Sequence, residues 1–243
     1  MNKGGTGHVE VIISFVLFIG FLAFILIAFN PLKPASNPAI VNSIYNVLEE
    51  NLSTELNKVS INLNFVPPGK ECFILHNTYQ LVSDLKCNNQ NILIKDKENH
   101  KKYAQITAGE IVSTLSPTSN FYTIYCSDEI DPVSGSVPNF NSCKEYDENE
   151  YGVGIIVSDE LWSLKKITSL ENEYTGNYPN MKKEFIRETS DFGFIIWDIN
   201  LNKEFDLTQD VPKGLDVISK TLPINIVNSD AIVTKHTITV MTW

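Results

Sequence analysis

The sequence lacks the short motifs that mark most catalytic and nucleotide-binding sites. It contains no Gly-x-Ser-x-Gly, no His-Glu-x-x-His, no Gly-x-Gly-x-x-Gly and no glycine-rich phosphate loop. Histidine is scarce as well, and its four copies share no spacing that indicates a metal site or a catalytic pair: His8, His76, His100 and His236. We therefore expect neither an enzyme nor a bound cofactor.

Positive charge is also in short supply. Lys and Arg number 19 against 29 Asp and Glu, which gives a formal net charge of −10. Nucleic acids and anionic lipid surfaces both attract clustered basic side chains. The composition therefore argues against nucleic acid as a partner.

Charge is absent altogether from residues 11–29, where Ser14 is the only polar residue. As a helix this run would span roughly 28 Å, close to the thickness of a bilayer's hydrocarbon core. The pattern predicts an N-terminal transmembrane helix over residues 6–30. The run is longer than that of an ordinary secretory signal, and no convincing small-residue cleavage site follows it. A plain signal anchor fits the length, but it leaves Glu10 unexplained, because a carboxylate beside such a run is costly without a partner.

The residues before the run form a second pattern. A short basic leader ends in a glycine pair, and a lone carboxylate follows: Lys3-Gly4-Gly5-Thr6-Gly7-His8-Val9-Glu10. This arrangement resembles the class III leader of archaeal type IV pilins, although Thr6 and His8 depart from the residues common at the first and third mature positions. The resemblance implies a leader at residues 1–5 that a prepilin peptidase removes by cutting between Gly5 and Thr6. It also implies that Glu10 neutralises the N-terminal amine of a neighbouring subunit.

The function implied by this resemblance is that of a pilin-like subunit of a surface filament, assembled through its N-terminal hydrophobic helix. The large head fits a minor or adhesive subunit, with other pilin-like subunits and the membrane as partners. Lys3 and the amine on one side of the run, against Lys33 on the other, favour a cytoplasmic N-terminus and an extracellular head. The alternative is a monomeric, signal-anchored extracellular domain that binds a ligand or a cell-envelope partner.

The four cysteines fit an extracellular head, because an even number outside the cell indicates disulfides. None of them has a second ligand at the close spacing that a zinc site requires. Three connectivities are possible, and nearest-neighbour pairing would close the shortest loops. The residues concerned are Cys72, Cys87, Cys126 and Cys143.

A proline-rich joint at residues 31–37 should end the first helix, and residues 38–243 should form the head. Asn37 and Pro38 are suited to begin a second, amphipathic helix. Its apolar stripe recurs at steps of three and four residues: Ile40, Ile44, Val47, Leu48, Leu52 and Leu56. Asn51-Leu52-Ser53 is a formal N-glycosylation sequon, although Leu52 lies on the stripe and the motif is short.

The rest of the chain predicts an α+β fold with a mainly antiparallel, β-rich head. Alternating or continuous apolar runs indicate strands at residues 59–65, 121–126, 192–199 and 232–243. Residues 104–115 are predicted as a short helix, and the mixed-charge run 95–102 as a solvated hairpin tip. The polar stretch 172–180 is a possible boundary between two subdomains.

Calcium is the remaining ligand to consider, because hard cations bind clustered oxygens. Weak candidates are Asp128, Glu129 and Asp131 in one acidic loop, and Asp198, Asn200 and Asn202 at alternate positions of another. The second set lacks the glycine and the final carboxylate of an EF-type loop. The simpler interpretation, which we favour, is a solvated acidic loop for the first set and a hairpin turn for the second.

Overall fold

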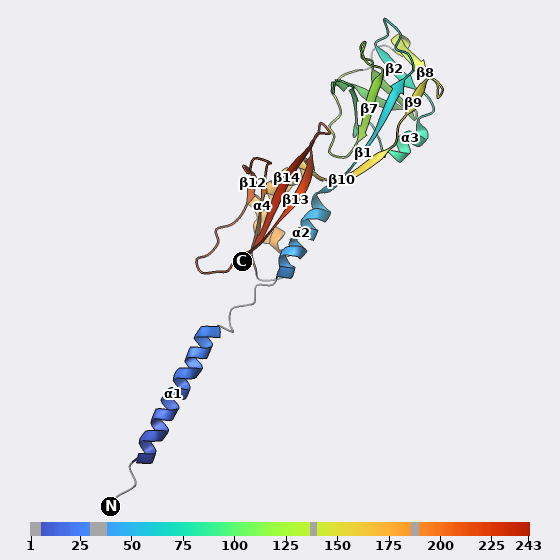
Figure 1. Ribbon diagram of the computed structural model, residues 1–243. Helices are drawn as coiled ribbons and strands as arrows, with labels where there is room; N and C mark the ends of the chain where they lie inside the picture. The colour runs from blue at the N-terminus through green and yellow to red at the C-terminus, as the bar shows by residue number, and fades with distance from the viewer. Residues whose placement is uncertain (1–5, 30–37, 137–139, 186–189) are drawn as a thin grey trace, which may run out of the picture. The chain divides into compact units, whose positions relative to one another are not determined.

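The computed structural model of the chain describes residues 6–29, 38–136, 140–185 and 190–243 (Figure 1). The chain divides into two compact units, residues 1–37 and residues 38–243. The first contains helix α1 (Thr6–Phe29), and the second is the head. The proline-rich joint at residues 31–37 lies outside the described residues.

Helix α1 corrects the fold class expected from the sequence. Among the described residues, no helix combines the length and the hydropathy that a membrane crossing requires. The prediction of an N-terminal transmembrane helix is therefore wrong, and the fold is a β-rich head with helices.

The head begins with helix α2 (Pro38–Leu52), whose buried stripe contains Val41, Ile44, Leu48 and Leu52. The helix ends at Leu52, and Ser53 begins strand β1 (Ser53–Leu63). Leu56, which the helical stripe had included, belongs to that strand and is buried there. Along β1 the buried positions alternate with less buried ones, with one change of phase where Leu56 and Asn57 are both buried.

A ten-stranded sheet connects the whole head, in the order β12-β11-β14-β13-β10-β1-β7-β3-β4, with β9 also paired to β1. Its pairs are antiparallel except for β10 with β13, which are parallel. The central strand β1 pairs with β10 along its first half and with β7 along its second. The strands are β3 (Ile92–Asp96), β4 (Lys101–Lys102), β7 (Phe121–Cys126), β9 (Tyr151–Val153), β10 (Val157–Ser163), β11 (Phe192–Trp197), β12 (Lys203–Leu207), β13 (Ile218–Val227) and β14 (Val233–Thr242).

The C-terminal part of this sheet packs against α2 and α4 (Leu164–Phe185), as Figure 1 shows. Phe192, Phe194 and Ile196 of β11 and Ile238 and Val240 of β14 are buried in this core. Because one helical layer covers one face of an antiparallel sheet, this part of the head is an α+β layer pair.

The other part of the head is a sandwich of two sheets. Strands β1, β3 and β7 face a second, four-stranded sheet of order β5-β6-β2-β8. Ile61 of β1, Tyr122 of β7, Phe73 of β2 and Tyr146 of β8 meet in the core between them. The second sheet comprises β5 (Ala104–Thr107), β6 (Glu110–Thr114), β2 (Cys72–Leu75) and β8 (Cys143–Tyr146). Helix α3 (Tyr79–Asp84) and the 3₁₀ turn Phe140–Ser142 lie between strands of the chain.

A further prediction is wrong. Residues 104–115 form the β5–β6 hairpin instead of a helix, with Ala108 and Gly109 at φ values of 51° and 82° in its turn. Residues 172–180 lie in α4, which is kinked at Asn177 (φ −149°, ψ 40°), and the subdomain boundary expected there stays a prediction. The helix accommodates this polar stretch because Tyr174 and Tyr178 point from it onto Phe192, while the polar residues are exposed.

Candidate functional site

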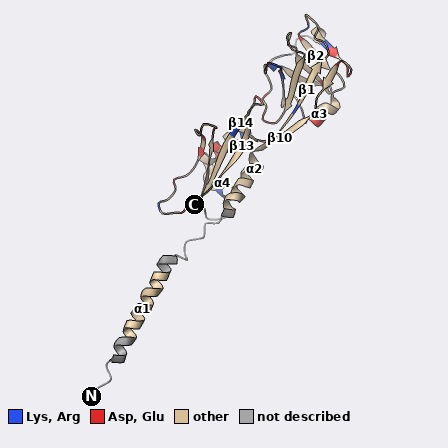
Figure 2. Ribbon diagram, viewed as in Figure 1, with Lys and Arg blue, Asp and Glu red and all other residues tan. Residues whose placement is uncertain are grey.

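Helix α1 exposes large apolar side chains around its whole circumference. From Val11 to Phe24 their exposed fractions run from 39% at Leu22 to 69% at Leu17, and consecutive residues such as Val11, Ile12 and Ile13 are all exposed. Residues 11–25 contain no charged residue, as Figure 2 shows. A helix that is apolar on every side needs an apolar environment on every side.

The residues assigned to processing and assembly lie at the start of this helix. Gly5 falls outside the described residues, and Thr6 is the first residue of α1. Glu10 lies in the same helix, but its side chain and that of Thr6 are outside the described part. The cleavage between Gly5 and Thr6 and the charge pairing of Glu10 therefore stay predictions.

The four cysteines form two disulfides, but not the pairs that close the shortest loops. Cys72 pairs with Cys143 across neighbouring parallel strands β2 and β8, and Cys87 pairs with Cys126 at the end of β7. The bridged residues are 71 and 39 positions apart in sequence. Both bridges lie in the sandwich, where they connect segments that meet only in the folded head.

The first acidic group proposed for calcium serves a helix instead. Glu129 is 1% exposed, and its carboxylate accepts hydrogen bonds from the Ser163 hydroxyl and from the backbone N–H of Lys165, at 3.2 Å. Ser163 in turn accepts from the N–H of Lys166 at 3.1 Å. Burial raises the pKa of Glu129, and these hydrogen bonds oppose that shift. Glu129 thus satisfies the N–H of Lys165 and Ser163 that of Lys166, two of the free N–H groups that need a partner at any helix start.

The neighbouring carboxylates are arranged differently. Asp131 forms an ion pair with the Lys165 ammonium at 2.8 Å. Asp128 lines an open polar groove together with Ser53, Glu55, Ser158, Glu160 and Lys166. The acidic loop therefore does not gather its three carboxylates around one point.

The second calcium candidate is a hairpin turn. The Asp198 carboxylate accepts the N–H groups of Asn200 and Asn202, both at 2.8 Å, and the side-chain amide of Asn202 at 2.9 Å. These hydrogen bonds lower the pKa of Asp198. An aspartate that closes its own turn in this way is an Asx motif, and its oxygens are already occupied by N–H donors.

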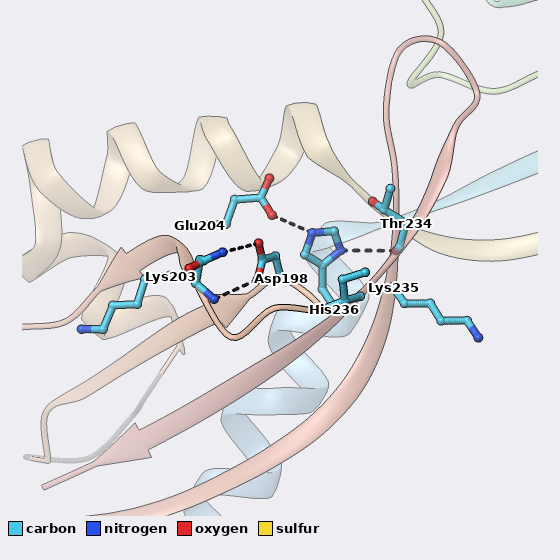
Figure 3. Close-up of a pocket in the computed structure, with 8 residues that line it drawn as sticks. Asp198, Lys203, Glu204, Thr234, Lys235 and His236 are labelled. Atoms are coloured by element: carbon cyan, nitrogen blue, oxygen red, sulfur yellow. Dashed lines mark hydrogen bonds and ion pairs between the residues drawn. The ribbon is translucent and has the colours of Figure 1, made fainter.

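Next to this turn is an open cleft of about 500 Å³ (Figure 3). Glu204 of β12 and His236 of β14 meet in it across the intervening strand β11, with 2.6 Å between Oε2 and Nε2. His236 Nδ1 lies 3.3 Å from the backbone oxygen of Thr234. The cleft supplies an oriented imidazole, but its one hydroxyl, on Thr234, donates to the Ile226 carbonyl. The pair of His236 and Glu204 thus connects β14 with β12.

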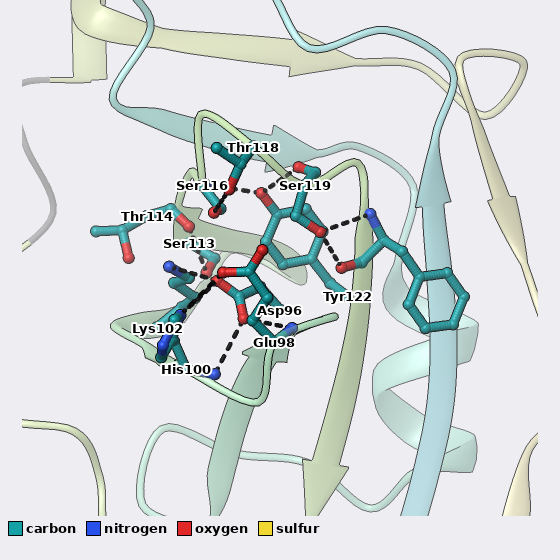
Figure 4. A network of polar contacts seen from close by, with 11 residues as sticks. Asp96, Glu98, His100, Lys102, Ser113, Thr114, Ser116, Thr118, Ser119 and Tyr122 are labelled. Atoms are coloured by element: carbon teal, nitrogen blue, oxygen red, sulfur yellow. Dashed lines mark hydrogen bonds and ion pairs between the residues drawn. The ribbon is translucent and has the colours of Figure 1, made fainter.

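The charged run 95–102 forms a hairpin, but its beginning is not solvated. Asp96 is 5% exposed and accepts the N–H groups of Glu98 and His100 at 3.0 Å, and its other oxygen lies 2.9 Å from the Lys102 ammonium (Figure 4). Burial favours the neutral acid, but the Lys102 ammonium and these N–H groups outweigh it and lower the pKa of Asp96 to about 2. Nothing in the local sequence signals this burial, because it arises from packing of the hairpin on the sandwich.

His76 also has carboxylate partners. Its Nδ1 lies 2.6 Å from Glu110 of β6, and its Nε2 lies 3.6 Å from Glu145 of β8. The hydrogen bond to Glu110 is the main reason that the pKa of His76 is raised. The three residues form a charged row at the end of the second sheet.

Among the described residues, no three His, Cys, Asp or Glu side chains are placed to hold a metal ion. The polar clusters of the head connect its own strands and helices, whereas the apolar surface of α1 is left open. Comparisons with known protein families, with curated proteins and with solved structures found no match for this chain.

Proposed function

We propose that this chain is a pilin-like subunit of a surface filament, probing or adhering through its head as a minor subunit does. Helix α1 forms the filament core by packing against copies of itself, and the disulfide-bonded head lies at the outside. The observation that carries this proposal is the apolar surface of α1, exposed on every side of the helix.

A second copy of the chain is the partner that fits this surface best. Copies offer α1 the same uncharged, apolar face that it presents itself, so association removes apolar area from water on both partners. A long helix of this kind is stable only when neighbours surround it, which a bundle of several copies provides. The class III leader pattern at Gly5 and Thr6 supports the same assembly, because removal of residues 1–5 would leave the amine of Thr6 close to the Glu10 of a neighbour.

The mass of the mature N-terminus tests the proposal directly. A chain isolated from the cells that make it should begin at Thr6. A chain that still begins at Met1 would contradict processing and, with it, the filament assembly proposed here.

The role of Glu10 has its own test. Glu10→Ala should abolish assembly and leave the head folded, because an uncompensated amine would then remain inside an apolar bundle. Glu50→Ala is the matched control, since Glu50 is an exposed glutamate of α2. Normal filaments from Glu10→Ala would show that this carboxylate has no part in assembly.

A further inference from the structure

The junction between α2 and β1 carries the sequon Asn51-Leu52-Ser53. Asn51 is exposed at the last turn of α2, Leu52 is buried in the core, and Ser53 begins β1 half-buried. Asn51 is therefore exposed although its neighbour Leu52 is buried. The amide that a glycan would occupy is at the surface of the folded head.

The surface next to this junction is a polar groove of about 580 Å³. Ser53, the third residue of the sequon, is one of its lining residues. Hydroxyl, carboxylate and ammonium groups line the groove: Ser53, Glu55, Asp128, Ser158, Glu160 and Lys166. Within the groove the Ser158 hydroxyl donates to Glu55 at 2.8 Å and the Lys166 ammonium donates to the Ser53 carbonyl at 2.6 Å. The carboxylates of Asp128 and Glu160 are acceptors that suit sugar hydroxyls.

We propose that Asn51 is an N-glycosylation site and that the first sugars of its glycan lie along this groove. The inference rests on the proposed function in one respect, because it requires the head to be exported. In the reaction, Asn51 Nδ2 bonds to the anomeric carbon of a glycosyl donor activated as a phosphate ester. The donor's C–O bond breaks, the phosphate leaves with the bonding electrons, and the amide nitrogen loses a proton to a base of the transferase.

The fold also limits when this reaction takes place. A transferase reads the hydroxyl two residues after the asparagine, so the sequon must be extended and accessible. In the folded head Leu52 is 2% exposed and Asn51 is helical. Glycan transfer therefore precedes closure of the α2–β1 junction, and the folded head then accommodates the glycan because Asn51 faces solvent.

The test is the mass of proteolytic peptides covering Asn51, from the full chain expressed in its own cells. The wild type and Ser53→Thr, which keeps the sequon, should carry sugar residues on Asn51. Ser53→Ala and Asn51→Gln should carry none. Far-ultraviolet circular dichroism of the purified variants establishes that the head is folded in each.

Unmodified Asn51 in the wild type would overturn the proposal, and so would a glycan that persists in Ser53→Ala. The same mass measurement also identifies the N-terminal residue, so the two proposals are tested separately. An unmodified Asn51 in a chain that begins at Thr6 overturns only the glycan. A glycosylated Asn51 in a chain that begins at Met1 supports the glycan and overturns the filament processing.

Discussion

Helix α1 and the head differ in the solvent exposure of the same residue types. Phe15 in α1 is 64% exposed, whereas Phe192 and Phe194 in β11 are fully buried beneath α4. Charged residues differ as well. Residues 11–25 of α1 contain none, whereas in the head the buried Asp96 pairs with Lys102 and the buried Glu129 accepts the N–H of Lys165. The residues compared here are buried in the head, whereas the apolar surface of α1 is exposed. This difference supports the proposed association of α1 with other copies of the chain.

The largest effect on assembly is expected when a charge is placed on the apolar surface of α1. Phe15→Asp should abolish assembly, because a carboxylate buried in an apolar bundle without a partner costs several kcal/mol. Phe65→Asp is the matched control, since Phe65 is 63% exposed in the head and lies outside the proposed core. Electron microscopy of filaments should show none for Phe15→Asp and normal ones for Phe65→Asp. Filaments from Phe15→Asp would refute the contact surface assigned to α1.

The stability of the head depends next on its disulfides. Closing loops of 71 and 39 residues constrains the unfolded chain, so removing either bridge should destabilise the head by about 4 kcal/mol in the chain-entropy picture. Cys72→Ala with Cys143→Ala, and Cys87→Ala with Cys126→Ala, should each lower the midpoint of guanidinium unfolding. An unchanged midpoint in either double variant would mean that the bridge adds no stability. Assembly through α1 should be lost only where the head no longer folds.

A smaller effect is expected from the buried charge in the β3–β4 hairpin. Asp96→Asn removes the counter-charge of Lys102, whose side chain is 16% exposed, and should destabilise the head by about 2–3 kcal/mol. Asp131→Asn, which breaks an exposed pair with Lys165, should change stability by less than about 1 kcal/mol. Urea unfolding of the two variants at neutral pH measures the difference, and equal values would contradict the role assigned to burial.

Because of Asp96, we expect the stability of the head to depend on pH in the acid range. The pKa of Asp96 is lowered to about 2, so its stabilisation is complete above its unfolded value near 4. It is lost as the pH falls from about 4 toward 2, and the Asp96→Asn variant should lack this component of acid unfolding.

The weakest effect should come from His76. Its pKa is raised above the ordinary value by Glu110, so protonated His76 stabilises the head below about pH 6.5, and this stabilisation is lost as the pH rises through the raised pKa. His76→Gln should flatten the pH dependence of unfolding above about pH 6.5 by less than about 1 kcal/mol. A wild-type profile that is already flat in this range would contradict the assignment.

Local patterns predicted some elements well and failed where two readings compete. The stripe of Ile44, Leu48 and Leu52 marks α2 correctly, because its period is helical over several turns. In residues 104–115 apolar residues recur at steps of three and four (Ala104, Ala108, Ile111 and Leu115), which suits a helix, but the positive φ values of Ala108 and Gly109 place a hairpin turn there. Leu56 fits both a helical stripe and an alternating strand, and pairing with β10 decides for the strand.

For the candidate site residues, the sequence predicts even less of the observed surroundings. Glu129 looked like one of three acidic loop residues, and its role at the start of α4 depends on a segment more than thirty positions away. Asp96 and Lys95 looked solvated within a charged run, yet both are buried. Asp198 is the exception, because the partners of its carboxylate are two and four residues away and the hairpin turn could be foreseen.

The sequence by itself determined what is local along the chain: the uncharged run of α1, the leader pattern before it, the α2 stripe, the sequon at Asn51 and the acidic composition. Only the tertiary structure decided which cysteines pair, which carboxylates are buried and which strands flank β1. The reason is physical. Propensity and periodicity act between residues a few positions apart, whereas disulfides, ion pairs and core contacts depend on proximity that exists only after distant segments have packed.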